Sequence, residues 1–314
     1  MEILLTGGAG FIGSKVCEKL LTIGHSVTII DNMSTGLKNN ISNKVNLIEC
    51  GAESSLIHEK LRKFKFDAIL HIGGQSSGEI GERNPLNDVH WNVVSTLNLL
   101  DYASKNNIKK FIYASSVGVY GSALKSRNEL LVEDDAGNPI SVYGTGKIVA
   151  EKYIDTYVKR GLVAFSLRMF NVYGPGQNMQ NPDQGMISIY LAQLIKNKKL
   201  QVKGSLQRIR DFVYIDDVVN AWIHALNFSD QTPEHYKLNI GSGKGYSVEH
   251  VIELLKHYFG EYPLEVLSST PGDQTYTIAN ISKAKEILSW TPEVDLEQGL
   301  AHFYNWAINN MENK

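Results

Sequence analysis

The feature that most constrains the fold of this chain is a glycine-rich turn close to its start. Residues 6–13 read TGGAGFIG, directly after an apolar run at residues 3–6 and at the start of a segment with helical spacing, 11–24. Glycines let such a turn bend sharply and let a pyrophosphate approach the helix N-terminus. A glycine triplet alone is weak evidence, but strand, turn and helix in this order predict a dinucleotide-binding unit. The turn residues expected to face the dinucleotide are Gly7, Gly10, Phe11, Ile12 and Gly13.

Short apolar runs rich in Ile, Val, Leu and Phe recur through the first half of the chain. Besides residues 3–6 they cover 26–31, 45–50, 67–72, 109–115 and 162–168, and we interpret them as buried strands. Segments with helical spacing lie between them, notably at 11–24, 85–106 and 141–161. Alternating strands and helices predict an α/β fold, a Rossmann-type doubly wound parallel sheet with helices on both faces.

An acidic residue at the end of the second predicted strand indicates which dinucleotide is bound. Asp31 follows the glycine turn at close to the spacing of about 20 residues typical of Rossmann units. Its carboxylate would accept hydrogen bonds from the adenosine ribose hydroxyls and repel a 2′-phosphate. The sequence therefore predicts NAD as the cofactor in preference to NADP.

The regular alternation of predicted strands and helices ends after Arg168. Residues 171–184 are dense in Asn, Gly, Pro and Gln. We expect an NAD-binding Rossmann domain at residues 1–170, to which 210–230 return, and a smaller C-terminal substrate-binding α/β part at 171–314. No repeat of 20 to 50 residues is visible, which argues against a solenoid.

Composition excludes several classes of function. The 314 residues carry a formal net charge of −2, so no basic excess is present for binding nucleic acid. The two cysteines, Cys17 and Cys50, fit a reducing compartment, and no apolar run approaches the roughly 18 residues that span a bilayer. We expect a cytoplasmic protein without a membrane segment, and no metal site, because the histidines lack ligand spacing.

Beyond these patterns, the chain resembles the extended short-chain dehydrogenase/reductase family, and within it the NAD-dependent nucleotide-sugar epimerase and dehydratase branch. The resemblance rests on the glycine turn, on Asp31 to Gly36, and on segments as far as Trp290-Thr291-Pro292. It implies a nucleoside-diphosphate sugar as substrate, a homodimer, and a place in polysaccharide biosynthesis. Further cofactor contacts implied by the family are Asn32, Ser34, Thr35, Gly73, Gly74, Gln75 and Asn92.

Two departures from the family pattern concern the cofactor. Gly73-Gly74 replaces the more usual pair of alanines, and the acidic residue commonly found near the adenine has no clear counterpart after the third strand. Glu53 is the residue that could take its place.

A tyrosine and a lysine four residues apart are the candidate catalytic pair. Tyr143 and Lys147 fall on one face of a predicted helix, downstream of Ser116 at the end of the fifth strand. A free phenol titrates near pH 10, but a neighbouring ammonium and a positive nicotinamide ring favour the phenolate. Tyr143 could then take a proton from a sugar hydroxyl. The family implies that Ser116 relays or steadies that proton.

The residues that follow Ser115 and Ser116 restrict which reactions are possible. Sugar-nucleotide dehydratases would carry an acidic pair where Val117 and Gly118 stand, decarboxylating relatives a glutamate at Gly118, and 3,5-epimerases a nearby cysteine. The leading interpretation is an NAD-dependent nucleotide-sugar 4-epimerase acting through a transient 4-keto sugar, on a UDP-hexose or UDP-N-acetylhexosamine. The alternative is a C4 dehydrogenase that releases a 4-keto sugar, with GDP- or CDP-linked substrates open. A non-catalytic NAD-binding regulator is disfavoured because both Tyr143 and Lys147 are present.

The resemblance also implies contacts to the sugar nucleotide. Arg210 would bind the diphosphate by charge-assisted hydrogen bonds, whereas we interpret Arg168 as structural and Arg208 as a solvated loop charge. Thr270 stands where many relatives carry an arginine. The remaining residues expected to bind substrate are Ser76, Ser116, Asn171, Val202 and Asp273, with Val202 explained equally well by an edge strand.

Overall fold

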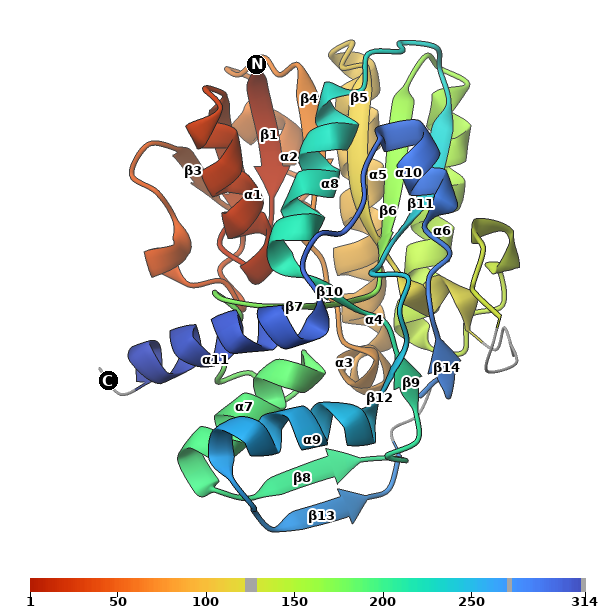
Figure 1. Ribbon diagram of the computed structural model, residues 1–314. Helices are drawn as coiled ribbons and strands as arrows, with labels where there is room; N and C mark the ends of the chain where they lie inside the picture. Colours follow the sequence, from red (N-terminus) through yellow and green to blue (C-terminus); the bar gives the residue numbers. More distant parts are fainter. Residues whose placement is uncertain (122–128, 270–272, 312–314) are drawn as a thin grey trace.

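A seven-stranded, entirely parallel sheet forms the centre of the molecule, in the order β11-β6-β5-β4-β1-β2-β3 (Figure 1). The computed structural model describes residues 1–121, 129–269 and 273–311. The predicted doubly wound α/β fold is confirmed. The sheet strands are β1 (Glu2–Thr6), β2 (Ser26–Asp31), β3 (Asn46–Glu49), β4 (Ala68–His71), β5 (Lys110–Ser116), β6 (Val163–Met169) and β11 (His235–Ile240).

One strand differs from the prediction of burial. β3 is largely exposed, because it lies at the edge of the sheet and pairs only with β2. The apolar run at 45–50 therefore predicts a strand correctly but not its burial.

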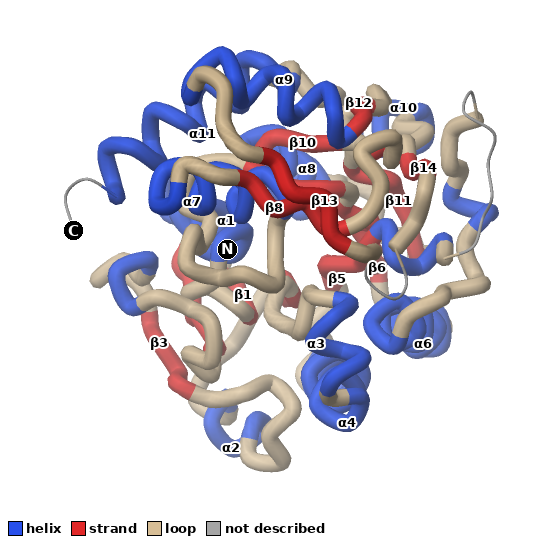
Figure 2. The backbone as a smooth tube through the Cα atoms, turned by 90° about the horizontal axis from the view of Figure 1, so that it is seen from below, coloured by secondary structure: helices blue, strands red, loops and turns tan. Residues whose placement is uncertain are grey.

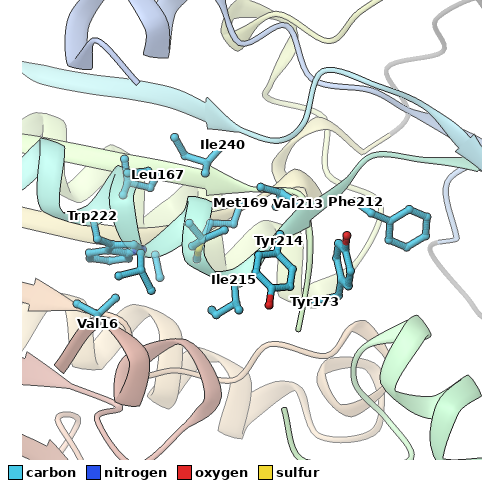
Figure 3. Close-up of a cluster of buried hydrophobic side chains, with 14 of the residues drawn as sticks. Val16, Leu167, Met169, Tyr173, Phe212, Val213, Tyr214, Ile215, Trp222 and Ile240 are labelled. Carbon is cyan, nitrogen blue, oxygen red and sulfur yellow. The ribbon is translucent and has the colours of Figure 1, made fainter. Parts of the chain in front are cut away.

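Helices cover both faces of the sheet. Alternation along β1 sends Ile3 and Leu5 into a core that includes residues of α1 and α8, while Leu4 faces a second core that includes residues of α5 and α6. Figure 3 shows the first core where Trp222 of α8 lies near Val16 of α1 and Leu167 of β6. The helices are α1 (Phe11–Thr22), α2 (Ile57–Leu61), α3 (Gly78–Arg83), α4 (Pro85–Asp88), α5 (Ser95–Lys105), α6 (Val142–Val158), α7 (Met186–Asn197), α8 (Ile215–Asn227), α9 (Val248–Phe259), α10 (Ser282–Leu288) and α11 (Leu296–Met311), with 3-10 turns η1 (Lys38–Asn40), η3 (Val117–Tyr120) and η4 (Glu133–Asp135).

The helix predicted at 85–106 is not regular. Between α4 and α5 the chain forms a π-helical turn, η2 (Val89–Val94), and α4 and η2 both pack against α6. Such π-turns are rare and often occur at functional sites.

The second half of the chain adds three small sheets and also returns to the central one. α8 packs against α1, β5 and β6, and β11 pairs with β6, so the strand that joins the sheet begins just beyond the predicted range of 210–230. The division into two parts stays a prediction. The small sheets pair β7 (Asn171–Tyr173) with β10 (Phe212–Tyr214), β8 (Leu200–Lys203) with β13 (Leu264–Leu267), and β9 (Ile209–Arg210) with β12 (Tyr246–Ser247) and β14 (Tyr276–Thr277).

The strand order reverses direction between β1 and β4, since successive strands are added outward from this pair on either side. Ligands of open α/β sheets bind in the crevice outside the carboxyl ends of the strands at such a switch point. In Figure 1 those ends point toward α7, β8 and α9, so the second half of the chain closes the crevice from below.

Arg168 has the structural role that the sequence analysis gave it. Its Nε and Nη2 donate to the two carboxylate oxygens of Glu151 (2.9 and 2.7 Å), and its Nη1 donates to Tyr120 Oη (3.2 Å). All three side chains are buried. The bidentate pair ties β6 to α6 next to the residues considered below.

Candidate active site

The glycine turn after β1 approaches two other segments of backbone very closely. Gly7 adopts a left-handed conformation (φ +70°), and a Cβ placed on it would lie 2.6 Å from the Cα of Gly73 after β4. A Cβ on Gly13 would lie 2.0 Å from the carbonyl oxygen of Gly7. Glycine at these positions therefore lets α1 and the β4 loop come together around the turn.

A cavity of about 240 Å³ opens beside this turn. The sequence placed the cofactor here, and the structure brings nearly all the residues in question to the cavity wall. They are Gly7, Gly10, Phe11, Ile12, Gly13, Asp31, Asn32, Ser34, Thr35, Gly73, Gly74, Gln75, Tyr143 and Lys147. Asn92 is the exception: its side chain is buried in η2 and lines neither of the two cavities described here.

The carboxylate of Asp31 is held in a fixed orientation at the cavity wall. Its Oδ2 accepts the backbone N–H of Ala9 and its Oδ1 that of Met33, both at 2.9 Å. Each oxygen keeps a further lone pair for a ribose hydroxyl. Glu53, which the sequence offered as a substitute acidic residue, lines the same cavity from the loop after β3.

Gln75 lines the cavity as predicted, and its side-chain amide is also hydrogen-bonded within the protein. Its side chain is 5% exposed and is already hydrogen-bonded within the protein: Nε2 donates to Ser77 O and to Asp88 Oδ2, and Oε1 accepts from Ser77 N. These bonds fix the orientation of the amide in the loop after β4, and Oε1 keeps a lone pair.

Tyr143 and Lys147 line this cavity, whereas Ser116 is 9% exposed and lines neither of the two cavities described here. Ser116 ends β5, and Ser141 begins α6 by accepting a hydrogen bond from the N–H of Gly144 at 3.0 Å. Tyr143, in the first turn of α6, lies close enough to Ser116 for that side chain to lower the pKa of the phenol. Lys147 follows one turn later, and its Nζ donates to Ala114 O at 2.9 Å and lies 5.7 Å from the centre of the Tyr143 ring.

Burial has a larger effect on the pKa of Tyr143 than the Lys147 ammonium has. It raises the pKa of the phenol to about 12, against the lowering effect of the Ser116 hydrogen bond. Burial also lowers the pKa of Lys147 to about 8. Burial therefore opposes the phenolate that the Lys147 ammonium and a positive nicotinamide ring are expected to favour, and both positive charges are needed to make Tyr143 a base at neutral pH.

A second cavity of about 270 Å³ adjoins the first, and Ser76, Ser77 and Gln184 line both. Asn171 and Arg210, expected to bind phosphate, line it together with Asp273. Arg210 Nη2 donates to Asp273 Oδ1 at 2.6 Å, which holds the guanidinium at the cavity wall.

Two predictions about this region are wrong. Arg208, interpreted as a solvated loop charge, is 7% exposed and bonded to the other oxygen of Asp273. Val202, considered as a border of the nucleotide base, is fully buried in the apolar core and lines neither cavity, since its side chain faces inward from β8. Thr270, Pro271 and Gly272 lie outside the described residues.

The sequence analysis missed a group of side-chain amides. Gln177, Asn178, Asn181 and Gln184 line the first cavity, and Gln184 Nε2 donates to Ser76 Oγ at 2.6 Å where the two cavities meet. The density of Asn and Gln at 171–184 is a signal that could have predicted these amides, but that pattern was interpreted only as a domain boundary. In the described part of the chain no group of three metal-ligating side chains gathers, and no helix is long and apolar enough to cross a membrane.

Known proteins are similar to this chain in sequence and in fold. The model of the NAD dependent epimerase/dehydratase family matches residues 3–241. A putative UDP-glucose 4-epimerase of Methanocaldococcus jannaschii is 36% identical over 311 residues, 98% of this chain and 99% of that protein. The Thermotoga maritima UDP-glucose 4-epimerase solved with UDP-glucose has a TM-score of 0.93 at 32% identity, covering 99% of this chain and 100% of that one. The Thermus thermophilus UDP-glucose 4-epimerase in complex with NAD gives 0.90 at 29% identity over 98% and 99%. The chain therefore belongs to the NAD-dependent epimerase/dehydratase family.

Proposed function

We propose that this protein is an NAD-dependent 4-epimerase of a UDP-hexose or UDP-N-acetylhexosamine. The observation that carries the proposal is the position of Tyr143, which lies within one helical turn of Lys147 on the wall of the dinucleotide cavity, with Ser116 near enough to lower the pKa of its phenol. The adjoining cavity presents Arg210 and Asn171, which suit a diphosphate. Similar proteins named UDP-glucose 4-epimerases support the same reaction.

Each of these residues would have its own role in the proposed epimerisation. Tyr143 takes the proton of the C4 hydroxyl while Ser116 holds the same oxygen, and hydride leaves C4 to give a 4-keto sugar. NAD, when bound, supplies the hydride acceptor and the positive charge that lowers the pKa of the phenol. Arg210 holds the diphosphate while the keto sugar turns over, and Tyr143 returns the proton when hydride is delivered to the other face of C4.

We further propose that the sugar is neutral. The described lining of the second cavity holds the carboxylates of Glu79, Asp183 and Asp273 and a single cation, Arg210. Glu79 and Asp183 are paired with cations that line neither cavity, Lys203 (2.8 Å) and Arg83 (2.9 Å). A uronate would add a carboxylate with no described cation free to receive it, which is unfavourable at short range.

A panel of UDP-, GDP- and CDP-sugars, followed by NMR and by absorbance together, tests the function. We expect UDP-hexoses or UDP-N-acetylhexosamines to interconvert at C4, with no lasting absorbance of NADH and little turnover of UDP-glucuronate. Stoichiometric keto sugar with reduced cofactor would instead establish the C4 dehydrogenase. A 6-deoxy-4-keto product would contradict both reactions.

A further inference from the structure

Asp88 is a carboxylate buried beside the catalytic pair, and the proposed mechanism does not use it. It ends α4 and is 0% exposed. Its Oδ2 accepts a hydrogen bond from Gln75 Nε2 at 3.0 Å, whereas Oδ1 has no hydrogen-bond partner among the described residues. A buried carboxylate with one oxygen unpartnered is costly unless an opposite charge lies nearby.

Two glycines allow this carboxylate to pack against neighbouring helices. A Cβ at Gly146 of α6 would lie 2.7 Å from Asp88 Oδ1, and a Cβ at Gly81 of α3 would lie 3.1 Å from Oδ2. Gly146 directly precedes Lys147, so the carboxylate is packed against the same turn of α6 that carries the ammonium. A larger residue at either glycine would displace it.

Among the described residues Asp88 forms no ion pair within 4.0 Å, but its negative charge is the largest influence that raises the pKa of Lys147. Burial raises the pKa of Asp88 itself, and the charge of Lys147 lowers it. On α6 itself, Glu151 is bonded to Arg168 and to Ser115 Oγ (2.6 Å) and is committed to them. Burial lowers the pKa of His71 on β4 to about 3, so that imidazole is neutral at neutral pH. The remaining titratable groups near Lys147 or Asp88 are Tyr113 on β5, Tyr143 on α6 and the exposed Glu82 on α3.

We propose that Asp88 is a positioning residue whose carboxylate is the buried counter-ion that keeps Lys147 in its ammonium form. This inference rests on the proposed function, because it takes Tyr143 and Lys147 to be the catalytic pair. Burial lowers the pKa of Lys147, while the negative charges of Asp88 and Glu151 raise it. Without Asp88 the pKa of Lys147 would fall further, so less of the amine would carry the positive charge that stabilises a phenolate.

The variant Asp88→Asn tests this directly, since the amide keeps the shape and can still accept the hydrogen bond from Gln75 but carries no charge. Lysine labelled with ¹³C at Cε reports the ionisation of Lys147 by NMR titration of the NAD-loaded protein, and the Lys147→Arg spectrum assigns the signal. We expect the pKa of Lys147 to fall by at least about one pH unit in Asp88→Asn. Asp101→Asn, a half-exposed carboxylate on α5, is the matched control and should leave it unchanged.

The substitution should also shift the pH profile of kcat in a predictable direction. Because the ammonium form is lost as pH rises through the lysine pKa, the alkaline decline of kcat should move to lower pH. At pH 8 a fall of one pH unit predicts about five-fold lower kcat, with KM for the sugar nucleotide little changed. Gly146→Ala, which displaces the carboxylate without removing it, should shift the titration in the same direction and serves if Asp88→Asn does not fold.

The outcomes separate the two proposals. An unshifted Lys147 titration in both Asp88→Asn and Gly146→Ala would overturn the role of Asp88. A shifted titration in a protein that interconverts no sugar would overturn the proposed function and leave the counter-ion assignment in place.

Discussion

Single side chains at this site are oriented by backbone groups before any ligand is bound. Asp31 shows this most clearly, since Ala9 N and Met33 N both donate to its carboxylate. The charge that we expect to select the cofactor is therefore fixed in place by the glycine turn and by the loop that follows β2. Such pre-organisation lowers the entropy cost of binding.

We predict that Asp31→Asn narrows the preference for NAD over NADP. The amide keeps most of the shape but removes the negative charge that repels a 2′-phosphate, and it weakens the ribose hydrogen bonds. A loss of roughly ten-fold in NAD affinity corresponds to about 1.4 kcal/mol. Calorimetry with both dinucleotides measures this, and a wild-type preference for NADP would contradict it.

Tyr143→Phe should lower kcat by at least ~100-fold, the usual scale for a positioned acid–base group, while NAD binding is kept. Tyr153→Phe is the matched control, because this tyrosine lies on the same helix and is 39% exposed. Steady-state kinetics with the identified sugar nucleotide provide the measurement. Near-normal turnover of Tyr143→Phe would remove this residue from the mechanism.

At the scale of elements, the sequence predicted the features that depend on residues close together along the chain. Buried strands and the helix starts at Phe11 and Val142 follow from apolar periodicity and turn chemistry, so the sheet and the catalytic helix could be predicted. The π-turn η2 depends on packing against α6. The pairing of Arg208 with Asp273 joins residues 65 positions apart, which no local pattern reveals.

Asp211 illustrates how one side chain connects several elements. Its two carboxylate oxygens accept hydrogen bonds from Ser242 N and Oγ, Gly243 N and Ala279 N, at 2.6 to 3.0 Å. It is 0% exposed and directly follows β9, so it joins this strand to the loops after β11 and β14.

We therefore expect Asp211→Asn to destabilise the fold by about 2–3 kcal/mol, because an amide NH₂ would face backbone N–H donors and leave them unsatisfied. The melting temperature should fall by several degrees, as followed by circular dichroism. Asp230→Asn, at an exposed turn, is the control. Equal melting of Asp211→Asn and wild type would show that these hydrogen bonds contribute little.

At the scale of the whole molecule, both halves of the chain contribute residues to the two cavities. The first half supplies the switch point and the Ser116-Tyr143-Lys147 group, and the second supplies Arg210 and the amides that connect the cavities. Neither half holds a complete site. Contacts such as Gln184 with Ser76 and Lys203 with Glu79 cross between them.

The outer faces of α4 and α6 lead to the last prediction, a homodimer. Figure 2 shows these helices side by side at the edge of the molecule. Leu86 is 74% exposed, Val89 43% and Tyr153 39%, whereas Leu100 of α5 is buried in the core. Apolar side chains left exposed on adjacent helices favour burial against a second copy of the chain. We expect a dimer at micromolar concentration in light scattering, and dissociation in Leu86→Glu. Leu264→Glu, at an exposed position on β13, should stay dimeric; a monomeric wild type, or equal effects of the two variants, would refute this interface.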